Sequence, residues 1–341
     1  MLERFGKTIA AVLLSIAVAG WPGAAAAKKF AGEFMASGGG ARALGMGGAF
    51  AAVASDASAL FWNPAGISGF EKRQALFMHS ERFGNLVNYN FAAFTSPTTA
   101  FMSAEREASF GVAVIHLGVD DIAVTNNLPI LDNNGVPGFQ PEAGDRLDTS
   151  SIPRESNNDF ALFTSYAMKT AHGRVGGTLK LIYTDAIGGF TATGVGLDLG
   201  FLRRNLFFER FDVGVKLQDI TGTYISWSTG TNEFIAPSVK LGLAYSLSSP
   251  ALNGALLLTA DGDFYFEDRR RASQFWVDRY SLDLHFGTEL QFQGKVMIRG
   301  GFDAGEEHNM NPTAGAGFRV GALGFDYAYL QHDDFESTHR V

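Results

Sequence analysis

Apolar and polar side chains alternate along much of this chain, most regularly in residues 280–293. One face of that segment carries Tyr280, Leu282, Leu284, Phe286, Thr288, Leu290 and Phe292, and the other carries Ser281, Asp283, His285, Gly287, Glu289, Gln291 and Gln293. Because successive side chains of a strand point to opposite faces, this pattern predicts a strand with one apolar and one polar face. The segment is longer than the roughly 5–6 residues of an average soluble strand.

The same alternation recurs along the chain. It is clear in residues 174–183, 194–201, 212–218, 238–247, 295–303 and 318–321, and weaker in residues 74–83, 88–95, 109–119, 158–169, 254–266 and 323–331. Membrane barrels of bacteria hold an even number of antiparallel strands, with apolar side chains toward lipid and polar ones toward the lumen. We therefore predict an all-β transmembrane antiparallel barrel of about 14 strands, with a soluble β-sandwich as the alternative.

The connections between these segments support the barrel. Residues 120–157, 220–236 and 267–279 are long, whereas residues 171–173, 292–294 and 321–322 are tight. Long loops on one side and short turns on the other are typical of outer-membrane barrels. The long loops 120–157 and 267–279 contain Phe139, Phe275 and Trp276, so they are candidates for contacts outside the membrane.

The N-terminus has the layout of an export signal. Charged residues (Glu3, Arg4 and Lys7) precede an apolar run over residues 9–19, and small residues over 24–27 suit a cleavage site. We predict a signal peptide over residues 1–27, a plug segment over 28–70 inside the barrel, and the barrel itself over 71–341. No later stretch is apolar for about 18 residues, as a membrane-spanning helix would require.

Composition narrows the function classes. The chain has 341 residues, with 41 Gly, 30 Phe and no Cys, and a formal net charge of −8. The lack of cysteine excludes disulfides and thiolate metal sites, and the acidic balance argues against a nucleic-acid partner. We expect no cofactor and no bound metal. The turn-like Asp132-Asn133-Asn134-Gly135 lacks the ligand spacing of a calcium loop.

Charged residues on the polar faces of the strands are predicted to line the lumen, because a charge on the lipid face would cost about 2–4 kcal/mol at the bilayer midplane. They could orient a substrate or simply neutralise one another against a plug. These candidates are Lys180, Asp198, Lys216, Lys240, Asp283, Glu289, Arg299, Arg319 and Asp326.

The plug segment is too rich in glycine for a long helix. Asp56 suits the N-cap of a short helix over residues 57–62, which Pro64 would end. A nucleotide-binding glycine loop is disfavoured, because no strand leads into the segment and no long helix follows it.

This segment resembles the opening signature of the PorV/PorQ family, a branch of the FadL-type outer-membrane transport superfamily. The resemblance is carried by a motif over residues 40–66 whose main positions are Arg42, Gly45, Gly47, Gly48, Asp56, Asn63, Pro64, Ala65 and Gly66. It implies a 14-stranded barrel whose N-terminal segment folds into the lumen as a hatch. Family members usually end in a full strand with a terminal aromatic residue, whereas this chain stops at Val341. We therefore expect a truncated last strand.

The resemblance implies two roles at the outer membrane, both with lipid as a partner. In PorV-like members the barrel assists a secretion system, so secretion components or secreted cargo are expected partners. In FadL-like members the barrel admits hydrophobic small molecules, which bind near the hatch and leave through a kinked strand. An enzyme is the alternative from another class. The seven His show no metal-binding spacing, and no paired base and nucleophile can be identified, so we predict that the protein is not an enzyme.

Overall fold

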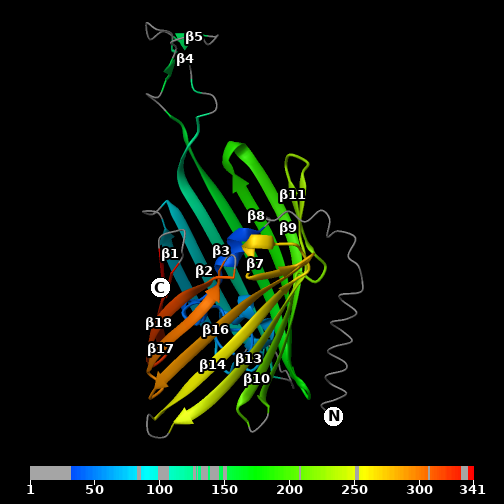
Figure 1. Cartoon of the computed structure of the whole chain (residues 1–341), viewed down its shortest axis with the longest axis vertical. Helices are drawn as coiled ribbons and strands as arrows, with labels where there is room; N and C mark the ends of the chain where they lie inside the picture. The colour runs from blue at the N-terminus through cyan, green and yellow to red at the C-terminus, as the bar shows by residue number, and fades with distance from the viewer. Residues whose placement is uncertain are drawn as a thin grey trace.

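The computed structural model describes residues 32–82, 86–98, 107–125, 128, 130–131, 137–138, 146–148, 152–206, 209–249, 253–305, 308–331 and 337–341. The predicted signal peptide, Phe139 and the Asp132–Gly135 turn lie outside the described residues. Within them the chain forms a tall barrel around a short N-terminal segment (Figure 1). No described helix has the length and apolarity needed to span a bilayer.

Fourteen antiparallel strands make up the wall, which confirms the predicted all-β barrel and excludes the sandwich. They are β1 (Gln74–Arg82), β2 (Val87–Pro97), β3 (Ala108–Ala123), β7 (Arg154–Thr170), β8 (Gly173–Ala186), β9 (Phe190–Leu206), β10 (Phe211–Gln218), β13 (Ser238–Ser249), β14 (Gly254–Tyr265), β16 (Tyr280–Phe292), β17 (Val296–Ala304), β18 (Met310–Val320), β19 (Leu323–Leu330) and β20 (Thr338–Arg340).

The last strand is short and closes the ring only in part. β20 spans three residues and pairs with Ala328–Leu330 of β19. Val341 then exchanges two backbone hydrogen bonds with His79 of β1, at N–O distances of 2.9 and 3.2 Å. The hydrogen bonds reach only the part of β1 and β19 nearest the long loops, so the barrel is nearly closed.

Additional short elements extend the side of the barrel that carries the long loops. The hairpin of β11 (Thr223–Trp227) and β12 (Asn232–Ile235) pairs with β9 beyond the end of β10. β15 (Phe275–Val277) pairs with β16, and β4 (Ile130–Leu131), β5 (Pro137–Gly138) and β6 (Arg146–Leu147) form a separate small sheet. Short 3-10 turns lie at η5 (Ile187–Gly189) and η7 (Arg270–Ala272).

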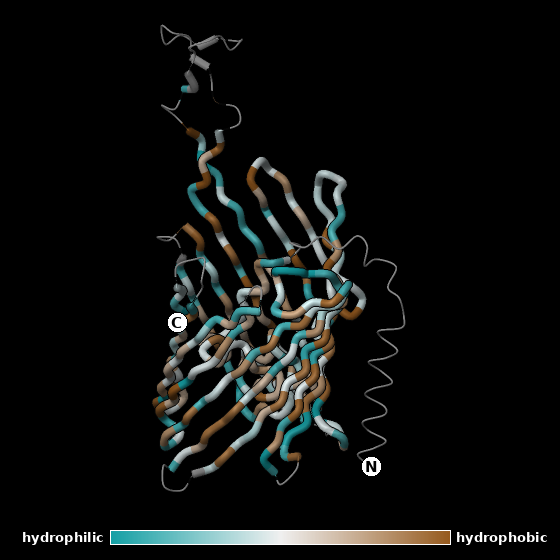
Figure 2. Tube along the Cα trace, viewed as in Figure 1, coloured by the Kyte–Doolittle hydropathy of each residue, from teal (hydrophilic) through white to brown (hydrophobic). Residues whose placement is uncertain are grey.

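The outer face of the wall is apolar. Leu181, Leu197, Leu243 and Phe286 are each more than a third exposed, whereas their sequence neighbours Lys180 and Asp198 are buried. Figure 2 shows apolar residues recurring along the strands. A barrel with apolar side chains outside and charges inside is suited to a lipid surrounding.

The N-terminal segment fills the lumen with four short helices: η2 (Glu33–Ser37), α2 (Ala41–Leu44), α3 (Ala59–Trp62) and η3 (Pro64–Ile67). Helix α3 starts at Ala59, two residues later than predicted, because the Asp56 carboxylate accepts the Ser58 N–H and holds residues 56–58 in a turn. Pro64 ends α3 as predicted, and it also opens η3, whose first turn is capped by Asn63.

Candidate functional site

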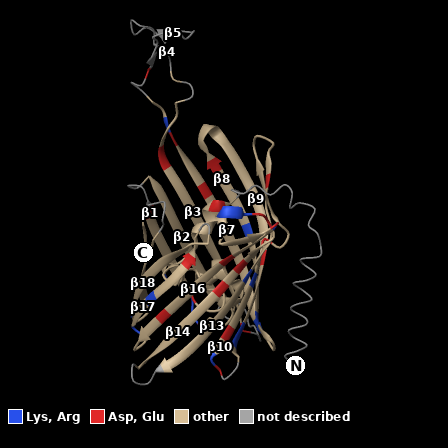
Figure 3. Cartoon of the chain, viewed as in Figure 1, with Lys and Arg blue, Asp and Glu red and all other residues tan. Residues whose placement is uncertain are grey.

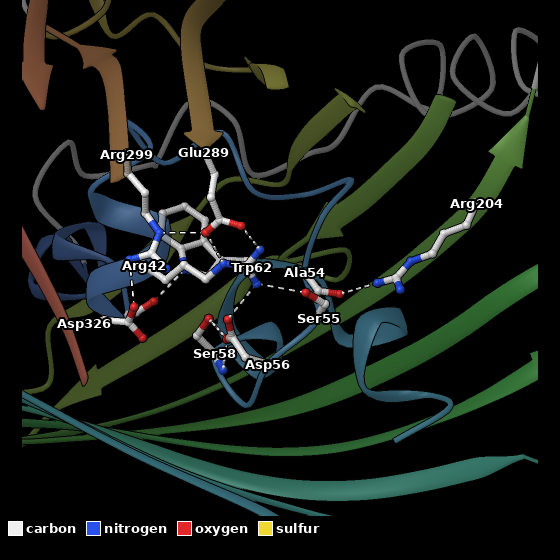
Figure 4. A network of polar contacts seen from close by, with 11 residues as sticks. Arg42, Ala54, Ser55, Asp56, Ser58, Trp62, Arg204, Glu289, Arg299 and Asp326 are labelled. Carbon is white, nitrogen blue, oxygen red and sulfur yellow. Dashed lines mark hydrogen bonds and ion pairs between the residues drawn. The ribbon is translucent and has the colours of Figure 1, made fainter. Parts of the chain in front are cut away.

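Arg42 fastens the N-terminal segment to the wall. Its Nε and Nη2 donate to the two carboxylate oxygens of Glu289 in β16, both at 2.9 Å. Arg299 of β17 donates to the same Glu289 at 2.7 Å and to Asp326 of β19 at 2.7 Å (Figure 4). Bidentate arginine–carboxylate pairs fix geometry as well as charge. We call Arg42, Asp56, Glu289, Arg299 and Asp326 the plug latch.

The plug side of the latch is equally well connected. Arg42 Nη1 donates to Ser55 Oγ at 2.9 Å and to Asp56 Oδ2 at 3.3 Å, and Arg204 of β9 donates to the Ala54 carbonyl at 3.0 Å. Burial alone would lower the pKa of the Arg42 guanidinium, but Glu289 and Asp56 outweigh it and raise this pKa. Arg42 is therefore charged at any physiological pH.

A second group of wall residues binds the plug backbone directly. The Asp261 carboxylate of β14 accepts the N–H groups of Phe50 and Ala51, at 2.9 and 2.8 Å. His285 of β16 lies with Nδ1 3.0 Å from the Gly47 carbonyl and 2.9 Å from Asp303. These contacts pair backbone groups of the plug that would otherwise be buried without a hydrogen-bond partner.

The motif residues after the latch also make tight contacts. Asn63 donates to the carbonyls of Ala51 and Phe201, at 2.8 and 3.1 Å, and accepts the Ala65 N–H at 3.2 Å. A Cβ at Gly47, which has φ +63°, would meet the Phe302 carbonyl oxygen at 2.5 Å. A side chain at that position is therefore both strained and obstructed.

The other glycines of the predicted motif also have little free space around them, because the N-terminal segment packs closely against the backbone of the wall. Gly45 lies beside Gly315 of β18, Gly48 has φ +73° and lies beside Trp62, and a Cβ at Gly66 would meet the Ala54 carbonyl oxygen at 2.5 Å. Pro64 and Ala65 are buried over Gly176 and Gly200.

A cluster of four buried charges crosses β8, β9 and β10. Lys180 contacts Asp198 at 3.0 Å and also pairs with Asp219, while Lys216 contacts the other oxygen of Asp198 at 3.2 Å. Lys216 Nζ also donates to the Phe61 carbonyl of the plug at 2.7 Å. Each charge is no more than 3% exposed, so pairing is required to offset desolvation.

The remaining predicted lumen residues are divided between two places. Lys240 of β13 pairs with Asp263 of β14 at 2.7 Å, and Arg269 pairs with Asp283 at 2.8 Å nearer the long loops. Arg319 differs from the others: it is exposed and lies one residue before the end of β18, at the tight turn. The other charges of the predicted set take part in ion pairs. Figure 3 shows how basic and acidic residues are distributed along the strands.

A cavity of about 450 Å³ lies between the plug and the long-loop side of the lumen. Its apolar lining includes Met35, Leu44, Phe61 and Trp62 of the plug. The charged residues Lys180, Lys216, Lys240 and Asp263 line its other side. The cavity is thus amphipathic, and its volume suits a small organic molecule.

Sequence reasoning did not select several residues of this site. Asp261 and Asp263 lie in a segment whose alternation was recognised only weakly, although their spacing of two already placed both on one face. Asp219 follows β10 with φ +53°, so no strand pattern could indicate that its side chain points into the lumen. Among the described residues no group of three His, Asp or Glu side chains could hold a metal ion.

Comparison with known proteins gives distant structural neighbours. No protein-family model matches the chain, and no curated protein matches it. Among solved structures, a deltaS2S3 mutant of the TodX monoaromatic hydrocarbon channel has 12% identity and a TM-score of 0.49, over 89% of this chain and 96% of that one. A deltaS2 mutant of the same channel has 10% identity and a TM-score of 0.44, over the same shares.

A mutant porin of Rh. blastica is more distant, with 11% identity and a TM-score of 0.29 over 79% of this chain and 88% of that one. At these scores the fold assignment comes from the strand pairing described above. The comparisons with family models and curated proteins return no PorV/PorQ member, so that resemblance is carried by the motif over residues 40–66 alone.

Proposed function

We propose that the protein is a FadL-like outer-membrane channel that admits hydrophobic or amphipathic small molecules through the cavity above its plug. The observation that carries this proposal is the cavity itself, whose floor is formed by apolar residues of the plug, including Phe61 and Trp62. Charged side chains such as Lys180, Lys240 and Asp263 line the rest of the cavity, so a molecule with an apolar body and a polar end fits it best.

The plug is held firmly to the wall in one part and loosely in another, which supports a gated passage. The latch, Asp261 and Asn63 hold residues 42–65 at several points of the wall. By contrast, η2 has one buried side chain, Met35, and makes up one side of the cavity. A molecule in the cavity therefore contacts both η2 and the latched part of the plug.

The accessory role in protein secretion remains a prediction from the motif. Binding of a cargo protein would use the long loops, of which residues 139–145 lie outside the described part of the chain. The internal cavity favours the small-molecule channel over that role.

Filling the cavity tests the proposal. Ala36 lines the cavity, so Ala36→Trp places an indole in it, whereas Ala322→Trp places the same side chain at an exposed tight turn. In vesicles carrying the purified barrel, uptake of a fluorescent apolar probe should fall about tenfold with Ala36→Trp and stay unchanged with Ala322→Trp. Equal uptake by the two variants would overturn the proposal.

A further inference from the structure

Four polar side chains form a hydrogen-bonded row on the outside of the barrel. His79 Nδ1 lies 2.8 Å from Asn90 Oδ1, Asn90 Nδ2 lies 3.3 Å from His116 Nδ1, and His116 Nε2 lies 3.0 Å from Asn158 Oδ1. The residues belong to β1, β2, β3 and β7, which are adjacent in the sheet. We call His79, Asn90, His116 and Asn158 the outer polar row.

The strand alternation places this row on the lipid side of the wall. Tyr89 and Phe91 point into the lumen, where Tyr89 donates to the Gly38 carbonyl and Phe91 contacts Gly39, so Asn90 points outward. By the same alternation, His79 shares a face with Phe77, and His116 shares one with Val114; Phe77 is 67% exposed and Val114 38%.

Neighbouring strands extend the polar character of this wall. The Tyr327 hydroxyl of β19 lies 2.6 Å from Nδ1 of His339 in β20, and the Tyr329 hydroxyl lies 2.8 Å from Oγ of Ser337, just before β20. Tyr327 shares its face with Phe325, which is 63% exposed. Hydrogen-bonded polar side chains are therefore set among the apolar residues of the outer face from β19 through β20, β1, β2 and β3 to β7.

Among the described residues, the wall formed by β14, β16 and β17 has no comparable row. Its outward residues include Leu258, Phe264, Leu284, Phe286, Ile298 and Phe302, and the polar ones are Thr288 and the terminal Tyr280. Lipid hydrocarbon can cover the wall of β14, β16 and β17 along its whole length. On the wall that carries the outer polar row, hydrocarbon would cover imidazole and amide groups, and their desolvation would cost free energy.

The position and internal pairing of the row indicate what covers it. His79 and Asn90 each lie three residues from the long-loop end of their strands, Arg82 and Val87. Both ring nitrogens of each histidine have a partner within 3.3 Å: Asn90 and Glu81 for His79, and Asn90 and Asn158 for His116. Side chains that are satisfied internally yet partly exposed suit the boundary between hydrocarbon and headgroups.

We propose that the outer polar row lies in the headgroup layer of the leaflet on the long-loop side, where the phosphate and ester oxygens of the lipid surround it. The headgroups descend along β1–β3, and the hydrocarbon layer beside this wall is thinner than beside β14–β17. This proposal does not depend on the transport role, because it concerns the lipid-facing side of the wall.

Cysteine accessibility tests the proposal cleanly, since the chain contains no cysteine. His116 and Leu284 are matched: each lies eight residues from the short-turn end of its strand, Ala108 in β3 and Phe292 in β16. Single barrels of His116→Cys and Leu284→Cys would be placed in nanodiscs of phosphatidylethanolamine and phosphatidylglycerol and treated with a charged, membrane-impermeant maleimide.

The expected result is that His116→Cys reacts about tenfold faster than Leu284→Cys, because the charged reagent enters the headgroup layer but not the hydrocarbon. Equal rates would overturn the proposal. If His116→Cys does not fold, as judged by heat-modifiable migration on a gel, Asn90→Cys paired with Ala260→Cys carries the same test. A cysteine that reacts in nanodiscs but is protected in native membranes would show that a protein covers the row, and would also overturn the lipid assignment.

Discussion

The two faces of the barrel wall differ in the side chains that they carry: charged ones are buried on the inner face, and apolar ones are exposed on the outer face. On β8, Lys180 points inward and is 1% exposed, while Leu181 beside it points outward and is 45% exposed. On β9, Asp198 and Leu197 show the same contrast, at 1% and 39% exposed. Each inward charge requires a partner of opposite sign, whereas each outward apolar residue requires only the surrounding lipid.

This difference shows where the structural information is concentrated. The inner face is specified residue by residue, through the latch, the Asp198 cluster and the close approach of the plug to wall glycines. The outer face is specified mainly by composition, so most apolar exchanges there should be tolerated. Four sets of substitutions, ordered by the size of the expected effect, test that contrast.

Removing one buried charge should have the largest effect. Lys180→Met leaves Asp219 without its lysine partner and should lower the free energy of unfolding by about 3–5 kcal/mol. Chemical unfolding in phospholipid vesicles measures the change. The double variant Lys180→Met/Asp219→Asn removes the uncompensated charge and keeps a residue that tolerates the φ of +53° at this position, so it should regain much of the loss. A single variant as stable as the parent protein would contradict the account of the inner face.

Placing a charge on the outer face should cost somewhat less and depend on depth. Leu181→Arg near the middle of β8 should lower the free energy of unfolding by about 2–4 kcal/mol. Leu323→Arg at the first residue of β19 lies near the membrane boundary and should cost about 0–1 kcal/mol. Equal costs at the two positions, measured in the same vesicles, would show that the outer face does not contact a hydrocarbon layer.

Breaking the latch should loosen the plug without unfolding the barrel. Arg42→Ala removes a bidentate ion pair with Glu289, worth about 1.5–3 kcal/mol. The loss should appear as larger and noisier conductance in planar bilayers, because the plug fills the lumen. Arg319→Ala removes an exposed arginine at a tight turn and provides the control, with conductance unchanged. Indistinguishable conductance traces from the two variants would contradict the claim that the plug latch holds the plug in the lumen.

Removing single hydroxyls should give the smallest effect. Tyr89 on the inner face donates to the Gly38 carbonyl at 2.6 Å, so Tyr89→Phe should lower the free energy of unfolding by about 0.5–1.5 kcal/mol. Tyr183 lies on the outer face and is 45% exposed, so Tyr183→Phe should leave stability unchanged. A reversed order of the two variants would weaken the contrast between the faces.

The sequence predicted the barrel because period-two alternation repeats strongly over many strands. It placed Lys180, Asp198, Lys216 and Glu289 on the polar faces for the same reason. It did not predict their partners, because ion pairs such as Arg42–Glu289 join residues 247 positions apart. Pairing at that separation depends on tertiary structure, and the alternation within one strand does not show which distant residues meet.

Other features escaped prediction for local reasons. Asp219 acts from a turn, where alternation ends. From the sequence alone, the outer polar row cannot be told from a polar face that lines the lumen. Only the contacts of Tyr89 and Phe91 with the plug show which side of β2 points to lipid. The start of α3 shifted because Asp56 caps a turn and pairs with Arg42 at the same time.

Depth-sensitive quenching gives the most direct test of the central claim, that apolar side chains face lipid while the plug and the charges occupy the lumen. Single cysteines at Leu181, Leu258 and Ile298 would carry a bimane fluorophore in vesicles containing lipids with doxyl-labelled acyl chains, with Ala36 as the luminal control. The account predicts strong quenching at the three wall positions and none at Ala36. Unquenched wall positions, or quenching at Ala36 equal to theirs, would contradict it.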